Sequence, residues 1–191
     1  MYFLRIFLSI IITAGLGFGG YAYWLMDEIK HQHNISTENV LFDTANILAA
    51  QLSEKLKNSE IDISGFEEAF RNLKKHQFEA SIYEHVIKTS EINAYITDAN
   101  KILLYNSNPD DNVGRVGQQV DWRDVTLTLK GKYGARSTQI DKGNEFSHVM
   151  YVSSAIREKD NTSFPANSLK EKIVGVVSVS KSAESFNNSL P

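Results

Sequence analysis

The residues best suited to chemistry form a group of aromatic side chains with one arginine and one serine. Its members are Tyr95, Tyr105, Trp122, Tyr133, Arg136, Tyr151 and Ser153. Arginine offers a rigid fork of N–H donors, so an aromatic-walled pocket around it would suit a small ligand with one anionic or strongly accepting group. The alternative is that the aromatic rings belong to a core or an interface, and that Arg136 pairs with Asp121 or Asp124.

Residue patterns typical of catalysis or metal binding are missing from the sequence. His31 and His33 lie one residue apart, but no third ligand lies nearby, so a solvated surface is the better interpretation. The absence of cysteine excludes a disulfide, a thiolate zinc site and a cysteine nucleophile. The sequence also lacks a serine in a nucleophile elbow and a glycine-rich phosphate loop. We therefore expect this chain not to be an enzyme and to hold no cofactor and no metal.

The site group must be positioned by strands and one short helix. Alternation places Tyr151 and Ser153 on one face of a strand over residues 146–156, and Met150 and Val152 on the other. One face must pack on helices. The other should line a pocket beneath a short helix that begins after Asp121 and runs to about residue 130.

Further strands follow from the same period of two. Residues 92–97 and 102–105 predict a hairpin around the turn-forming residues 98–101, and two more strands are expected at 136–140 and 172–180. A helix capped by Ser64 and Glu67 should end near Lys74. Two helices followed by about five strands predict an α+β fold with an antiparallel sheet.

A long helix precedes these elements. It carries one apolar stripe, made of Val40, Leu41, Ala45, Leu48, Ala49, Leu52 and Leu56. The stripe predicts core packing, or a seam between two copies in which Leu41, Leu48 and Leu52 continue down from a membrane. This stalk helix starts afresh at Asn34, Ser36 or Thr37, or it continues the N-terminal helix without a break.

The N-terminal segment has the composition of a membrane span. Residues 6–26 contain no charged side chain, and a helix of this length extends roughly 32 Å, enough to cross a bilayer. Arg5 precedes the run and Asp27 and Glu28 follow it, which places residues 1–5 in the cytoplasm. A cleaved signal peptide is the alternative, but the aromatic Tyr23 and Trp24 favour a retained anchor.

Length and composition leave room for one ordinary domain after the N-terminal segment. Of the 191 residues of the whole chain, 42% are hydrophobic and 23% are charged, values typical of a globular protein. The formal net charge is −3 and the basic residues are scattered, so no nucleic-acid surface is indicated.

Four segments resemble the sensor region of CreC-type sensor histidine kinases. They are residues 95–99, 122–138, 149–152 and 174–179. The segment 122–138 is specific to that type, whereas the others recur among extracytoplasmic PAS-like domains of the single-Cache type. The resemblance covers roughly residues 38–181, and the N-terminal anchor lies where the family has its first membrane helix.

The resemblance implies a membrane-anchored sensor in the bacterial inner membrane. Residues 27–181 would form a periplasmic PAS-like input domain, and residues 182–191 would lead to a second membrane helix. Stimulus binding would act through the stalk helix of a homodimer on a cytoplasmic kinase that is absent from this chain. The alternatives are the input domain of a chemoreceptor or of a cyclic-dinucleotide enzyme, or a stand-alone anchored ligand-binding module.

Some positions depart from the related patterns. Lys101 stands where the family has a turn glycine, and Ala155 replaces a proline. Dicarboxylate and citrate sensors of similar architecture place basic residues around 104–108 and at the position of Tyr151, and this sequence has none there. A di- or tricarboxylate held in that familiar way is therefore not supported, and the stimulus is open.

Overall fold

The computed structural model describes residues 2–57, 60–75, 80–82, 85–87, 90, 92–108, 115–139, 142–143, 147–158 and 171–182. The first residue of one predicted strand (146), the last of another (140) and residues 183–191 lie outside this part, as does the side chain of His33. The chain divides into two compact units, residues 1–39 and residues 40–191, which are described separately.

The first unit is helical throughout its described residues. It holds the N-terminal part of α1 (Tyr2–Glu54), whose apolar side chains, among them Phe3, Phe7 and Phe18, are exposed. Within the described residues, α1 is the one helix long and apolar enough to cross a membrane. It has no break at Asn34, Ser36 or Thr37, so the stalk helix does not start afresh there.

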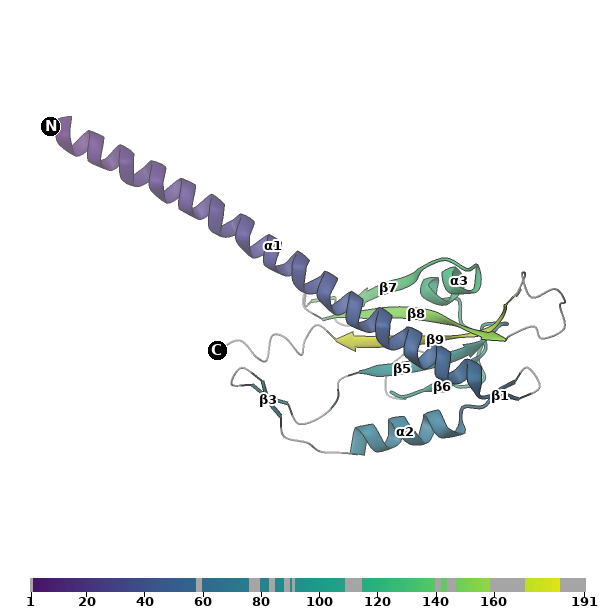
Figure 1. The fold of residues 1–191 in the computed structure, drawn as a ribbon. Coiled ribbons are helices and arrows are strands. Elements are labelled where there is room, and N and C mark those ends of the chain that lie inside the picture. The colour runs from purple at the N-terminus through teal and green to yellow at the C-terminus, as the bar shows by residue number, and fades with distance from the viewer. Residues whose placement is uncertain are drawn as a thin grey trace. The chain divides into compact units, whose positions relative to one another are not determined.

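The second unit is built on a five-stranded antiparallel sheet (Figure 1). Its strands are β5 (Asn93–Asp98), β6 (Leu103–Asn106), β7 (Gly134–Gln139), β8 (His148–Glu158) and β9 (Lys172–Ser182). They lie in the order β6-β5-β9-β8-β7, and every neighbouring pair is antiparallel. The predicted α+β class, the long N-terminal helix and the five-stranded antiparallel sheet are confirmed.

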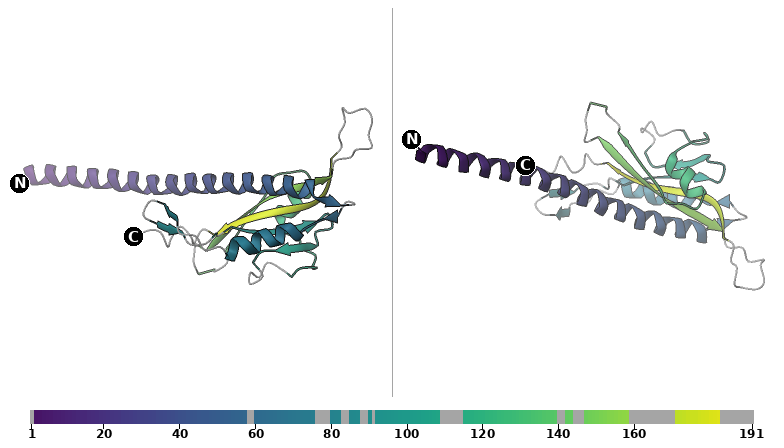
Figure 2. Two further views of the ribbon diagram at one scale, coloured as in Figure 1. Left: turned by 60° about the horizontal axis from the view of Figure 1, so that its bottom comes forward. Right: turned by 90° about the horizontal axis from the view of Figure 1, so that it is seen from above.

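Helices cover both faces of this sheet (Figure 2). The C-terminal part of α1 and α2 (Ser64–Lys75) pack on one face through Leu41, Ala45, Ala49, Leu52, Phe66 and Phe70. The short helix α3 (Arg123–Leu129) packs on the other face through the buried Val125. Most of the predicted stripe is therefore core, but Val40 is exposed.

The prediction that Leu41, Leu48 and Leu52 form a seam between two copies is wrong. Leu41 and Leu52 are buried against the sheet of their own chain, and Leu48 packs beside them. A second copy cannot reach these side chains without separating α1 from the sheet.

The turn between β5 and β6 is stabilised by the side chain of Asp98. The Oδ1 atom of Asp98 accepts the backbone N–H groups of Asn100 and Ile102, at 2.9 and 2.7 Å. Lys101 has a φ of 65°, the left-handed conformation that glycine adopts without strain. The backbone conformation at position 101 therefore favours glycine, the residue that the related sensors have there.

The predicted cap of α2 differs from the one in the structure. Ser64 donates its hydroxyl to Asp62 at 2.6 Å instead of forming a box with Glu67, which pairs with Arg71. The residue before α3 is Trp122, which makes no side-chain cap. Two small antiparallel hairpins were also not predicted: β1 (Leu56–Lys57) with β2 (Glu60–Ile61), and β3 (Ala80–Ile82) with β4 (His85–Ile87).

Candidate functional site

The candidate site centres on the carboxylate of Asp124, which α3 holds against the sheet. Asp124 is fully buried. Its Oδ2 accepts the hydroxyls of Ser153 and Ser178, each at 2.9 Å, and that of Tyr95, while its Oδ1 accepts Nε–H of Arg136 at 3.0 Å. One side chain of α3 is therefore bonded to β5, β7, β8 and β9.

The strand register brings these donors together. Asn106, Tyr95, Ser178, Ser153 and Gly134 are aligned across β6-β5-β9-β8-β7. Since paired residues share a face, this row crosses the sheet beneath α3.

Gly134 ends this row because a side chain would not fit there. A Cβ at this position would lie 2.1 Å from Oγ1 of Thr128 and 2.3 Å from the backbone oxygen of Asp124. The glycine thus allows α3 to approach β7 closely enough for the carboxylate to reach its donors.

Arg136 lies between two aromatic rings. Its guanidinium carbon is 3.9 Å from the ring centroid of Tyr151 and 5.2 Å from that of Trp122. Nη1 donates to Thr138 at 2.9 Å. Nη2 is buried and has no hydrogen-bond partner in the described part of the chain. Because Nε and Nη2 share one edge of the guanidinium, Asp124 uses half of a fork that can hold a carboxylate with two bonds.

Burial and charge set the ionisation of these groups. Burial, and then the neighbouring Asp124 carboxylate, raise the pKa of the Tyr95 hydroxyl well above its ordinary value. Burial alone lowers the pKa of Arg136, but its interactions with Tyr95 and Asp124 outweigh this and raise the pKa overall. At neutral pH, Tyr95 is a neutral donor and Arg136 a cation.

Five of the seven predicted site residues gather here. Trp122, Arg136, Tyr151 and Ser153 surround Tyr95, whose ring meets Trp122 edge to face at 4.6 Å between centroids. The predicted faces of β8 are confirmed, because Val149 and Tyr151 pack toward α3 whereas Met150 and Val152 pack toward α1.

The other two predicted residues lie elsewhere. Tyr105 packs against Phe66 and Phe70 on the α2 side of the sheet. Tyr133 is 50% exposed and its ring contacts Phe42.

The structure decides between the two ion pairs considered for Arg136. Asp124 is its partner, whereas Asp121 is exposed and pairs with Lys101 at 2.6 Å. The hydrogen bond and charge of Lys101 lower the pKa of Asp121. Ser178 was not predicted as a site residue, although its alternation with the apolar Val177 and Val179 is a usable signal.

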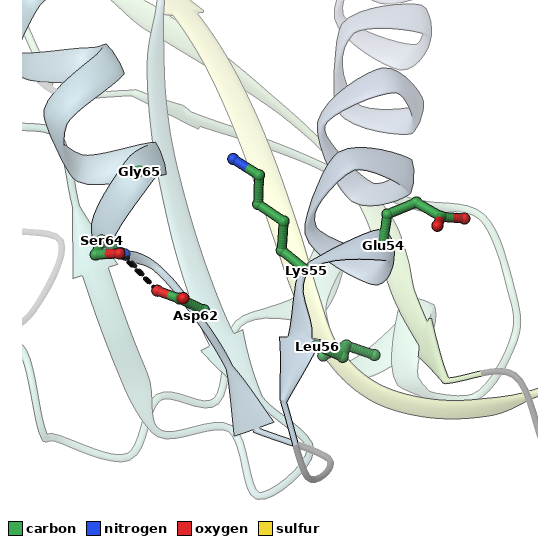
Figure 3. A pocket seen from close by; sticks show the side chains of 6 residues that line it. All are labelled: Glu54, Lys55, Leu56, Asp62, Ser64 and Gly65. Carbon is green, nitrogen blue, oxygen red and sulfur yellow. Dashed lines mark hydrogen bonds between the residues drawn. The ribbon is translucent and has the colours of Figure 1, made fainter.

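A separate hollow of about 410 Å³ opens between the end of α1 and the start of α2 (Figure 3). It is lined by Glu54, Lys55, Leu56, Asp62, Ser64 and Gly65. None of these was predicted as a site residue. Both charge signs occur in its lining, so it offers no single ligand chemistry. Among the described residues, no group of three histidine, aspartate or glutamate side chains could hold a metal ion.

Comparisons with known proteins point to a sensor. No family model matches the chain. The sensor protein CreC of Escherichia coli K12 is 33% identical over 155 residues, which is 81% of this chain and 30% of that protein. The sensor domain of the histidine kinase DctB of V. cholerae aligns with a TM-score of 0.43 and 14% identity, over 88% of this chain and 59% of that one. This chain spans about 30% of the length of the curated relative, and this homology supports a sensor region similar to that of CreC.

Proposed function

We propose that this chain is the signal-input region of a two-component sensor histidine kinase whose kinase module lies outside these 191 residues. The observation that carries the proposal is the 33% identity to the sensor protein CreC over 81% of the chain. The five-stranded sheet with a long helix on one face is the architecture expected of such an input domain.

The membrane placement is supported by the first unit. Its apolar side chains are exposed, as they would be to lipid, and the charges of Arg5, Asp27 and Glu28 flank the run at residues 6–26. Residues 1–5 are cytoplasmic in this proposal. Residues 27–181 form the periplasmic domain, and residues 182–191 lead to a second span.

The route from the site to α1 is short. Tyr151 and Ser153 face Asp124, while Val152 between them packs on the α1 side with Leu41. A change in how α3 lies on β8 and β9 therefore alters the surface on which α1 packs. In this proposal, such a change shifts the population of two packings of α1 and thereby the output of the kinase.

The stimulus site of this proposal is the cluster under α3. Trp122, Arg136 and Tyr151 would contact a small acceptor, and Tyr95 and Ser153 would form the floor. The buried Nη2 of Arg136, which has no hydrogen-bond partner among the residues that the structure describes, supports this assignment. Tyr105 packs toward Phe66 and Tyr133 contacts Phe42, so this proposal does not include them in the stimulus site.

A chimera tests the proposal. The segment of E. coli CreC that aligns with this chain is replaced by the corresponding segment of this chain, and phosphate incorporation from ATP is measured in membrane vesicles. We expect the chimera to be phosphorylated and Gly134→Ala, which forces α3 off β7, to change the rate severalfold. Ser137→Ala, on the exposed face of β7, is the matched control.

Equal rates for the chimera, its Gly134→Ala variant and a CreC lacking the segment would refute an input role. The reading frame downstream of residue 191 separates the alternatives. Kinase modules there support the proposal, whereas a chemoreceptor module, a cyclic-dinucleotide enzyme or a stop codon would contradict it.

A further inference from the structure

The α3 face of the sheet buries several polar side chains beside its apolar cluster. Its buried residues include Tyr95, Thr97, Ser153, Ser178 and Ser180. Burying hydroxyl groups is unfavourable unless they are hydrogen-bonded. Three of these hydroxyls, those of Tyr95, Ser153 and Ser178, meet at one oxygen of Asp124.

These three donors and Arg136 form a binding site for a carboxylate. A guanidinium and several hydroxyls aimed at one point is the donor set that recognises a carboxylate in a ligand. The donors all lie on the sheet, whereas the acceptor comes from α3, a separate element. The sheet therefore carries the site and α3 supplies its occupant.

Asp124 fits this site only in part. Its carboxylate accepts the Nε–H of Arg136, but among the described residues Nη2, on the same edge, has no hydrogen-bond partner. A free carboxylate, which is not tethered to the backbone of α3, can approach that edge with both oxygens. Oγ1 of Thr128 on α3 is also buried without a partner in the described part of the chain.

We infer that Asp124 is an internal ligand, whose carboxylate occupies a site on the sheet that accepts a small external carboxylate once Asp124 is removed or displaced. In the framework of the proposed function, the stimulus is then a carboxylate-bearing molecule that competes with Asp124 for Arg136. The binding chemistry itself does not depend on any kinase output, so it can fail or succeed separately.

Chemical rescue tests the inference with formate as the probe, because formate matches the group that Asp124→Ala removes. The full chain in detergent micelles is unfolded thermally in 0.1 M sodium formate and in 0.1 M sodium chloride. In chloride, we expect the variant to have a lower melting temperature than the parent. In formate, the melting temperature of the variant should be about 3–6 °C higher than in chloride, while that of the parent should be the same in both salts. Formamide, which has the shape but not the charge, should give no shift.

Two further variants give the rescue its specificity. Asp121→Ala removes an exposed carboxylate of the same segment and should show no formate effect. Asp124→Ala combined with Arg136→Met removes the charge partner and should abolish the rescue.

The inference is overturned if Asp124→Ala is folded and melts equally in both salts, or if the double variant responds as strongly. Where Asp124→Ala is unfolded in chloride, recovery of native tryptophan fluorescence in formate supports the inference, and no recovery overturns it.

Discussion

The Asp124–Arg136 pair joins α3 to the sheet at the cost of burying two charges. The carboxylate is fully buried and the arginine side chain is 18% exposed, so solvent screens the pair little. Removing one partner of such a pair leaves an uncompensated charge, whereas replacing both is often tolerated. The packing of α3 on the sheet is therefore sensitive to substitution of one member of this pair.

Arg136→Met should lower the free energy of unfolding by about 3–5 kcal/mol, because Asp124 then stays buried without its counter-charge. Combining it with Asp124→Asn should restore most of that loss. Urea denaturation of the parent, the single variant and the double variant measures the three free energies of unfolding. If Arg136→Met alone were as stable as the parent, the pair would not hold α3 on the sheet.

Because of Tyr95, the free energy of unfolding of the domain should depend on pH in the alkaline range. Its folded pKa lies well above the unfolded value near 10, so above about pH 10 the unfolded chain loses a proton that the folded chain keeps. The stabilisation is complete below that pH and is lost as the pH rises toward the folded pKa. The slope reaches about −1.4 kcal/mol per pH unit for one group.

Tyr95→Phe should remove this contribution, so that its free energy of unfolding falls less steeply than that of the parent between about pH 10 and 11.5. Denaturant titrations at a series of pH values provide the two slopes. Parallel slopes would mean that Tyr95 does not keep its proton in the folded state.

At the scale of elements, local pattern predicted most of the fold. Alternation gave the five strands and the two faces of β8, and the apolar stripe gave the packed side of α1. What local pattern could not give was the pairing between strands. Tyr105 was placed in the site because its type fits, but it is paired with Ile96 and therefore faces α2. Likewise, local pattern could not choose Asp124 over Asp121, because the choice depends on how α3 docks: Asp124, on the helix, is buried against Arg136, whereas Asp121, which precedes the helix, is exposed.

The approach of α3 to β7 makes Gly134 a sensitive position. Gly134→Ala places a methyl group 2.3 Å from the backbone oxygen of Asp124, which cannot rotate away. We expect the variant to lose about 2–3 kcal/mol of stability through overpacking. Ser137→Ala, exposed on the same strand, should stay within about 0.5 kcal/mol of the parent. Thermal unfolding compares them, and a stable Gly134→Ala protein would contradict close packing of α3.

At the scale of the whole molecule, the charges around the apolar run predict its orientation. Arg5 precedes the run and Asp27 and Glu28 follow it, so a reporter enzyme that is active only in the periplasm should be active when fused after residue 75. The same fusion to a variant with Arg5→Glu and Asp27→Arg should lose activity. Mature protein that begins near Tyr23 would instead identify a cleaved signal peptide.

A homodimer through α1 has to use the side of the helix that does not meet the sheet. Val40 and Ile47 are both exposed and lie seven residues apart, hence on one side of the helix. The apolar side chains that face the sheet, Leu41 and Ala45, are buried in the core of their own chain. Contact between two copies along Val40 and Ile47 would leave that core intact.

Cysteine crosslinking in membranes distinguishes this side of α1 from the rest of the helix. Ile47 is 59% exposed and Phe42 is 41% exposed, but Phe42 points to a different side and contacts Tyr133. Ile47→Cys should therefore crosslink between copies more readily than Phe42→Cys, while Ala49→Cys, buried on the sheet, should crosslink least. Labelling with a maleimide first establishes that both exposed thiols are reactive. Equal crosslinking at positions 47 and 42 would then mean that the copies meet by random collision and that α1 forms no seam.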